Sequence, residues 1–139
     1  MTSEVVYQGG LRTRATHLRS GQSILTDAPV DNQGKGEAFS PTDLVATALA
    51  SCILTIMGIR ARDRGLHIEG ARARVNKIMA SNPRRIARVE IAIEMPEGAF
   101  TPEDRRVLEE AMRTCPVCRS LSAELEVAAS IHWPESTPA

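Results

Sequence analysis

Three cysteines are the residues of this chain best suited to chemistry. Cys52 lies in a long apolar stretch, and a second sulfur pair lies in the run Cys115-Pro116-Val117-Cys118. Proline suits the first position of a helix, so Cys115 is expected at a helix cap, where the dipole and free N–H groups stabilise a thiolate. The spacing also permits a local disulfide. Two packed small apolar side chains are the alternative, and spacing alone does not choose between them.

Cys52 taken by itself is more typical of a packed residue. Free cysteine is among the most buried residue types, and an apolar environment raises the pKa of a thiol. Catalysis by Cys52 therefore needs a cation that stabilises its thiolate. Arg12, Arg14 and Arg19, in the opening hairpin, are the candidates, although a solvated strand face is the simpler interpretation of each one.

A zinc site is a rival use of the same sulfurs. The three cysteines with one of His17, His67 or His132 would supply four ligands. The chain has one Cys-x-x-Cys pair and no Cys or His at partner spacing, so we expect no metal and interpret the histidines as surface or strand residues. No catalytic Ser-His-Asp set, glycine-rich phosphate loop or His-Glu-x-x-His motif appears.

Composition narrows the class of protein. The 139 residues fit one domain, 1–139, with no internal repeat and with a tail at about 134–139 that is expected to fray. The charge balance, 17 basic against 17 acidic side chains, argues against binding to nucleic acid or to an anionic membrane. The apolar stretch 44–59 falls short of the ~20 residues of a membrane span. Without an N-terminal signal-peptide pattern, we expect a cytoplasmic protein.

Strands are predicted where apolar and polar residues alternate. Two stretches near the N-terminus, 4–17 and 22–27, are joined by a turn at 19–22. A hairpin over 71–94 and a last strand over 125–133 show the same period of two. Each of these stretches should have one face turned toward a core.

Two helical regions carry the cysteines. The run Ser40-Pro41-Thr42-Asp43 is typical of a helix start, and this helix should reach about residue 64 and stop at Gly65. A second helix starts at Thr101, is interrupted at Cys115-Pro116, and continues to about Leu121.

Strands that cluster in hairpins favour an α+β fold with antiparallel sheet over a doubly wound one. The first helix is apolar nearly all round, which is typical of a central helix. The predicted strands are too few to cover this helix on all sides. A second copy of the chain would supply the missing cover, and we expect an obligate dimer.

At this point the chain resembles the OsmC/Ohr family, the osmotically inducible and organic hydroperoxide resistance proteins of bacteria. The resemblance runs from about residue 4 to residue 133. It is carried by the following motifs: Ser40-Pro41-Thr42-Asp43-Leu44, the small-residue run from Ala46 to Ser51 into Cys52, Gly65-Leu66, and Cys115-Pro116-Val117.

The resemblance implies an intertwined homodimer in which antiparallel sheets of both chains wrap long central helices. It also implies peroxidase chemistry on organic hydroperoxides at the subunit interface. Cys52 matches the peroxidatic cysteine, which becomes a sulfenic acid, and Cys115 matches the resolving cysteine, which forms a disulfide with it. The reductant would be an external dithiol, lipoyl-type in relatives, and no bound cofactor is implied.

The polar partners match the family less closely. Arg19 is the nearest match to the arginine that stabilises the thiolate. Thr42 stands where the hydroperoxide-resistance branch carries a glutamate that holds this arginine, and Asp43 follows one position later. One residue turns a side chain by about 100° on a helix, so Asp43 is predicted to act as a cap. Cys118 is a further departure, and the chain looks closer to the broad OsmC-like group.

Three functions are compatible with these cysteines. The first is a peroxidase that uses Cys52 and Cys115. The second is a thiol-disulfide protein or redox sensor that uses Cys115 and Cys118, with Cys52 merely packed. The third is a non-catalytic dimer that binds a small apolar ligand.

Overall fold

The structure is a computed structural model that describes residues 1–135. The chain forms two compact units, Met1–Val45 and the remainder from Ala46 onward, although the sequence alone indicated no boundary. The predicted fraying of the tail concerns residues that mostly lie outside the described part of the chain. The α+β class is confirmed.

The N-terminal unit is built on a three-stranded antiparallel sheet. Its strands are β1 (Ser3–Gly9), β2 (Arg12–His17) and β3 (Ser23–Asp27), in that order, followed by a short 3-10 helix, η1 (Val30–Asn32). The prediction of one strand over 4–17 was wrong. Gly9, Gly10 and Leu11 have φ values of 82°, 62° and 63°, so the chain reverses there into a hairpin. The predicted turn at 19–22 is confirmed, with the His17 N–H donating to the Gln22 carbonyl at 2.8 Å.

Apolar side chains of this sheet are open to solvent. Val5 and Tyr7 point to one face and Val6 to the other, because successive strand residues alternate. Their exposed fractions are 60%, 64% and 51%, and Ile24 and Leu25 on β3 are exposed at 50% and 43%. Within one chain, therefore, neither face of this sheet forms a closed core.

The long helix α1 (Pro41–Asp63) begins and ends as the sequence predicts. The Ser40 N–H donates to Asp43 Oδ2 at 3.0 Å and the Asp43 N–H donates to Ser40 Oγ at 3.1 Å, a reciprocal cap. At the other end Gly65 has a φ of 68°, and the Leu66 N–H donates to the Ala61 carbonyl at 2.8 Å. This is the glycine-terminated helix end that leaves few carbonyls unpaired.

By length and composition alone, α1 would be able to cross a membrane, although the apolar stretch 44–59 within it is shorter than a membrane span. The helix is 23 residues long because it continues beyond the apolar stretch at both ends. The core helix of a soluble protein meets the same criteria. In this structure Leu49, Ile53 and Met57 have no exposed surface and belong to the hydrophobic core.

The second unit adds a mixed sheet rather than an antiparallel one. Strands β4 (Arg72–Ala80) and β5 (Arg85–Glu94) form the predicted hairpin, but β6 (Glu126–His132) pairs parallel to β5. A parallel pair needs a crossover connection. Here that crossover contains α2 (Pro102–Glu109), α3 (Ala111–Thr114) and α4 (Pro116–Ser120), which carry the chain back to the end from which β5 started.

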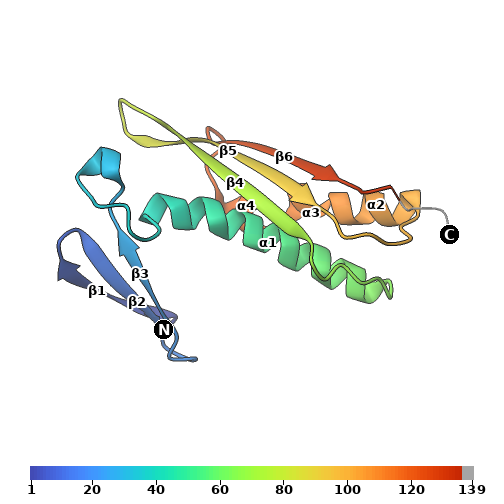
Figure 1. Cartoon of the computed structure of the whole chain (residues 1–139), viewed down its shortest axis with the longest axis horizontal. Helices are drawn as coiled ribbons and strands as arrows, with labels where there is room; N and C mark the ends of the chain where they lie inside the picture. The colour runs from blue at the N-terminus through green and yellow to red at the C-terminus, as the bar shows by residue number, and fades with distance from the viewer. Residues whose placement is uncertain (136–139) are drawn as a thin grey trace. The chain divides into compact units, whose positions relative to one another are not determined.

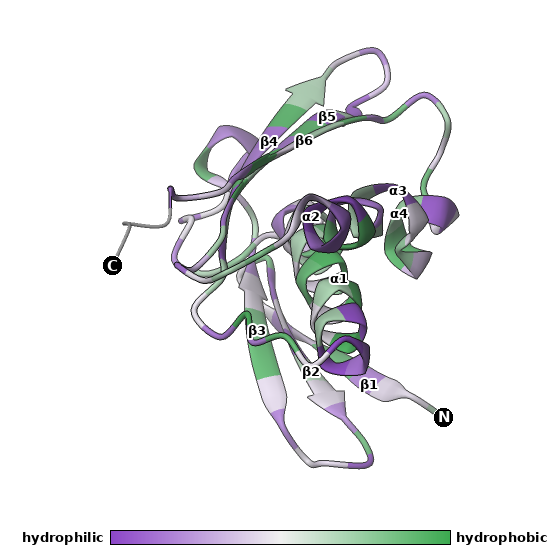
Figure 2. Ribbon diagram, turned by 90° about the vertical axis from the view of Figure 1, so that its right-hand side faces the viewer, coloured by the Kyte–Doolittle hydropathy of each residue, from purple (hydrophilic) through white to green (hydrophobic). Residues whose placement is uncertain are grey.

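The core of this unit lies between α1, the sheet and the crossover helices. In Figure 1 the sheet β4–β6 runs along one side of α1, and Figure 2 shows that α1 is largely hydrophobic whereas α2 is largely hydrophilic. Fully or almost fully buried side chains from each element meet there: Leu49, Ile53 and Met57 of α1, Val89, Ile91 and Ile93 of β5, Leu108 of α2, and Ala111 of α3. These are the faces that the alternation and the helical spacing predict.

One face of α1 remains exposed, which we call the outer face of α1. Its members are all solvent-exposed residues at helical spacing: Ala48, Ser51, Thr55, Ile59 and Arg62. Ile59 alone is 52% exposed. A helix expected to be buried on every side is thus covered on only part of its circumference by its own chain.

Candidate functional site

Cys115 lies at the junction of two short helices. Its extended backbone, with φ −67° and ψ 142°, ends α3 and caps α4, and Pro116 takes the first position of α4. The Cys118 N–H donates to Cys115 Sγ at 3.3 Å. The predicted position of Cys115 at a helix cap is therefore confirmed.

The predicted effect of that position on the thiol was wrong. Burial raises the pKa of Cys115 to about 11, and the Cys118 N–H, which acts in the opposite direction, does not offset it. The side chain has no exposed surface, and α4 has five residues, too short to supply a strong dipole. At neutral pH Cys115 is thus a protonated thiol.

Cys52 lies beside Cys115 although the two are far apart in the sequence. The thiols of Cys52 and Cys118 both interact with Cys115 and help to raise its pKa. Cys52 is half-buried on α1, at the margin of the outer face of α1, and Cys118 is half-buried on α4. All three cysteines are free. The fold therefore gathers three thiols, and the fully buried one interacts with both others.

An arginine on α1 holds the segment that precedes Cys115. Arg60 Nη1 donates to the Val107 carbonyl at 2.9 Å, and Arg60 Nη2 donates to Thr114 Oγ1 at 2.7 Å. Thr114 is the neighbour of Cys115, and its hydroxyl in turn donates to the Glu110 carbonyl at 3.0 Å. Arg60 and Cys52 belong to the same helix. Arg60 therefore ties Cys115 to the element that carries Cys52.

A second arginine, Arg64, forms an ion pair that stabilises the start of the crossover. Arg64 Nη2 contacts Asp104 Oδ1 at 2.8 Å, while the other oxygen of Asp104 accepts the Thr101 N–H at 3.0 Å. The Thr101 N–H and the Arg64 guanidinium hold the pKa of Asp104 below its ordinary value. Arg60 on α1 and Arg64, just after the end of α1, thus hold both ends of the α2–α3 segment.

We expect Arg60→Met to slow formation of a Cys52–Cys115 disulfide by roughly 10- to 100-fold, because small misplacements of reacting atoms cost rates of this order. The measurement is the rate of disulfide formation under a mild thiol oxidant, followed by alkylation and peptide mapping. Arg60→Lys, which keeps one donor, should restore part of the rate.

Arg113→Met is the matched control, because Arg113 is an exposed arginine of α3 that lies outside the outer face of α1. It should leave the rate unchanged. If Arg60→Met lowered the thermal stability but not the rate of disulfide formation, Arg60 would be a structural residue only.

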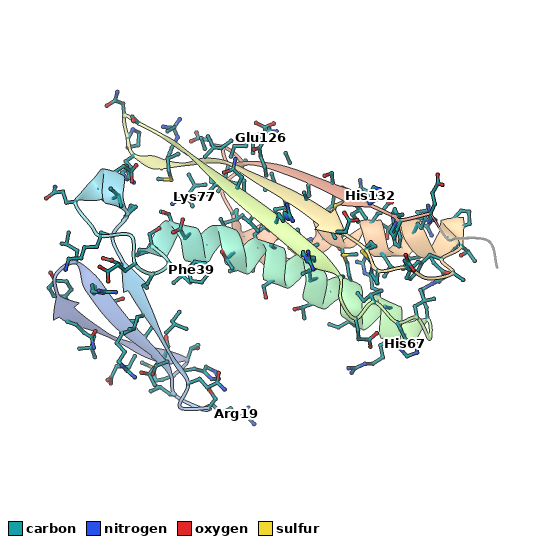
Figure 3. All side chains as sticks on the ribbon, in the orientation of Figure 1. Arg19, Phe39, His67, Lys77, Glu126 and His132 are labelled. Carbon is teal, nitrogen blue, oxygen red and sulfur yellow. The ribbon has the colours of Figure 1, made fainter. Side chains whose placement is uncertain are left out.

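The arginines proposed from the sequence all lie in the N-terminal unit. Arg12 on β2 forms an ion pair with Glu37 at 3.3 Å. Arg14, on the same strand, is exposed, and Arg19 extends from the tip of the β2–β3 hairpin (Figure 3). Cys52 belongs to the other unit. No contact within the described part of the chain tests which of the three arginines faces Cys52, so the choice of Arg19 remains a prediction.

Thr42 and Asp43 serve the start of α1. Asp43 closes the reciprocal cap with Ser40, as the one-residue shift predicted, and Thr42 Oγ1 lies 3.2 Å from Ser40 Oγ. The capping role is therefore confirmed for Asp43. Neither contact tests whether these residues also hold an arginine.

The histidines have local partners. His17 Nδ1 lies 2.7 Å from Ser20 Oγ, and His132 Nδ1 lies 3.1 Å from Glu94 Oε1 on the adjacent strand. His67 is exposed, and its Nδ1 lies 3.7 Å from Glu69 Oε1. Among residues 1–135, no three His, Cys, Asp or Glu side chains are grouped so that they could hold a metal ion.

Two hollows border α1. One, of about 550 Å³, lies between the C-terminal half of α1 and the loop that leads to β4, and the other, of about 410 Å³, lies against β4. Leu54 and Thr55 line both, and Cys52 lines neither. Neither hollow therefore gives a substrate direct access to the Cys52 thiol.

Comparisons with known proteins identify chains of similar sequence and fold. A protein from Psychrobacter arcticus, named for osmotic stress induction and detoxification response, is 52% identical, with a TM-score of 0.91 over 95% of this chain and 96% of that one. Two others share the fold. An organic hydroperoxide resistance protein OsmC from Legionella pneumophila is 17% identical (TM-score 0.70; 94% and 96% covered), and an OsmC-like protein from Mycoplasma pneumoniae is 16% identical (TM-score 0.79; 96% of both).

No match was found among curated proteins. The family model for OsmC-like proteins matches residues 34–130, which include α1 and all three cysteines. That range is more than half of the chain. The protein therefore belongs to the OsmC-like family.

Proposed function

We propose that the protein is a thiol-dependent peroxidase that reduces organic hydroperoxides. The observation that carries this proposal is the interaction between the thiols of Cys52 on α1 and Cys115 at the start of α4, two cysteines brought together from distant parts of the chain. Family membership and the stress-related name of the 52% identical relative support a role in peroxide defence.

Each cysteine has its own step. The Cys52 thiolate attacks the outer oxygen of the hydroperoxide, the O–O bond breaks, and the products are an alcohol and a Cys52 sulfenic acid. The Cys115 sulfur then attacks the sulfenic sulfur, and hydroxide leaves as water with the thiol proton. An external dithiol reduces the resulting disulfide and is itself oxidised to a disulfide. A lipoyl-type dithiol is our proposal for that reductant.

The state of Cys115 suits a resolving role. A thiol that is protonated at neutral pH is a poor nucleophile toward peroxide, so it does not compete with Cys52 for the first step. Once the sulfenic acid forms next to it, the reacting sulfurs are already neighbours, which makes even a scarce thiolate effective.

The proposed active unit is a homodimer in the cytoplasm. Exposed apolar residues on both faces of the N-terminal sheet, and the outer face of α1, support a second copy as cover. Cys52 lies at the margin of that outer face, so a partner chain would help to enclose it. The cover would also supply the apolar surroundings that favour organic hydroperoxides over hydrogen peroxide.

The test is a single turnover with one equivalent of an organic hydroperoxide, stopped by alkylation and analysed by peptide mapping. A Cys52–Cys115 disulfide should form first. Below its pKa, each unit of pH raises the thiolate fraction of a thiol about tenfold, so disulfide formation should accelerate about tenfold per pH unit above neutral. Burial, the main cause of the raised pKa, persists when Cys52 is oxidised.

Two results would count against the proposal. Slow oxidation spread over all three cysteines would favour the non-catalytic, ligand-binding alternative. A Cys115–Cys118 disulfide that forms equally well without Cys52 would favour the thiol-disulfide alternative, which the contact of the Cys118 N–H with Cys115 Sγ supports.

A further inference from the structure

We propose that Cys118 is a third redox-active residue, which takes over the disulfide from Cys52 and returns Cys52 to its thiolate form. The inference rests on the proposed peroxidase function and deepens it. It assigns a role to a sulfur that the two-cysteine mechanism leaves unused.

The local geometry places Cys118 next to the sulfur that it would attack. Its own N–H contacts Cys115 Sγ at 3.3 Å, across the first turn of α4. Cys115 caps this helix and Cys118 is its third residue, and two cysteines in a Cys-x-x-Cys arrangement at a helix start are close enough to form a disulfide. No large movement of the chain is needed for this bond.

Cys115 is the central sulfur of the three. It is fully buried and interacts with both Cys52 and Cys118, which are each half-buried. A disulfide between Cys52 and Cys115 would therefore have its Cys115 sulfur within reach of Cys118 and out of reach of solvent. An intramolecular thiol is then better placed to attack that sulfur than an external reductant is.

The exchange balances without any outside reagent. The Cys118 thiolate attacks Cys115 Sγ, a Cys115–Cys118 bond forms, the Cys52–Cys115 bond breaks, and Cys52 leaves as a thiolate. The proton that Cys118 gave up remains available to Cys52. One disulfide is present before and after, so no sulfur is oxidised or reduced overall.

The exchange has one consequence for turnover. Cys52 is free to reduce a second hydroperoxide before any reductant arrives. Without reductant, each chain should consume two equivalents of hydroperoxide, and end with a Cys115–Cys118 disulfide and an oxidised Cys52.

The experiment compares the unaltered chain with Cys118→Ser, both fully reduced, and treated with two equivalents of cumene hydroperoxide per chain without reductant. Consumption of the hydroperoxide is measured, and samples are alkylated at intervals for peptide mapping. Serine keeps the backbone N–H that contacts Cys115. We expect a transient Cys52–Cys115 disulfide followed by Cys115–Cys118 in the unaltered chain, with two equivalents consumed. In Cys118→Ser the first disulfide should persist, with one equivalent consumed.

The other outcomes separate the two proposals. A Cys52–Cys115 disulfide that persists in both proteins, with equal consumption, would overturn the role of Cys118 and leave the peroxidase proposal standing. Absence of that disulfide from both proteins would overturn the peroxidase proposal itself, and the role of Cys118 with it. Formation of Cys115–Cys118 at the same rate in Cys52→Ser would show direct oxidation of the pair and likewise overturn both.

Discussion

Cys52→Ser is expected to abolish hydroperoxide reduction, with residual activity no higher than that of a free thiol. A serine hydroxyl is not ionised at neutral pH and cannot attack the O–O bond at a useful rate. The two other cysteines do not compensate, because Cys115 stays protonated and Cys118 acts only on an existing disulfide. Hydroperoxide consumption in the presence of a lipoyl-type dithiol measures this loss.

Cys115→Ser is the matched comparison and should fail in a different way. The first step remains, so without reductant the chain consumes one equivalent of hydroperoxide and stops with a sulfenic acid on Cys52. A sulfenic-acid probe such as dimedone should label Cys115→Ser and leave Cys52→Ser unlabelled. Full activity in Cys52→Ser would show that Cys52 is only a packed residue of α1.

Thr55→Arg is expected to dissociate the proposed dimer. Thr55 lies in the middle of the outer face of α1 and is exposed within one chain, so the substitution should change the stability of the single chain little. Under a partner chain, the same arginine would be a buried and unpaired charge. Such a charge costs about 3 kcal/mol or more, which weakens association by roughly a hundredfold or more.

Analytical ultracentrifugation over a range of concentrations measures this change. Ala123→Arg, which adds the same charge at an exposed turn before β6, should leave the association unchanged. We also expect peroxidase activity to fall together with dimerisation, because Cys52 borders the same face. A Thr55→Arg protein that remained a dimer would show that a partner chain does not cover this face.

Much of the fold is accessible from the sequence because the signals are local. The cap at Ser40 and Asp43 and the stop at Gly65 fix α1 almost to the residue. The strand prediction over 4–17 failed because Gly9 and Gly10 were interpreted as part of a strand, whereas consecutive glycines with positive φ make a tight hairpin. The parallel pairing of β5 and β6 was not predicted, since strand direction depends on where a long crossover returns.

The site, like the fold, was predictable from the sequence only where the signals are local. The residues Cys52 and Cys115 follow from motifs, but the pKa of Cys115 does not. A helix start and burial shift the pKa of a thiol in opposite directions, and only the packed structure shows that burial dominates here. Arg60 was missed because nothing in the sequence separates it from Arg62 and Arg64, which follow it along the chain. Its contacts with Val107 and Thr114 exist only because the crossover folds back onto the helix.

The position of Cys52 on α1 and of Cys115 in the crossover also links redox state to resistance to unfolding. A bond between these sulfurs closes a loop of about 60 residues, which restricts the unfolded chain by about 4 kcal/mol in the chain-entropy model. A bond between Cys115 and Cys118 closes a far smaller loop and restricts the unfolded chain much less. The reduced chain is therefore the form most open to proteolysis, and oxidation by a hydroperoxide would protect the protein for as long as the long-range bond lasts.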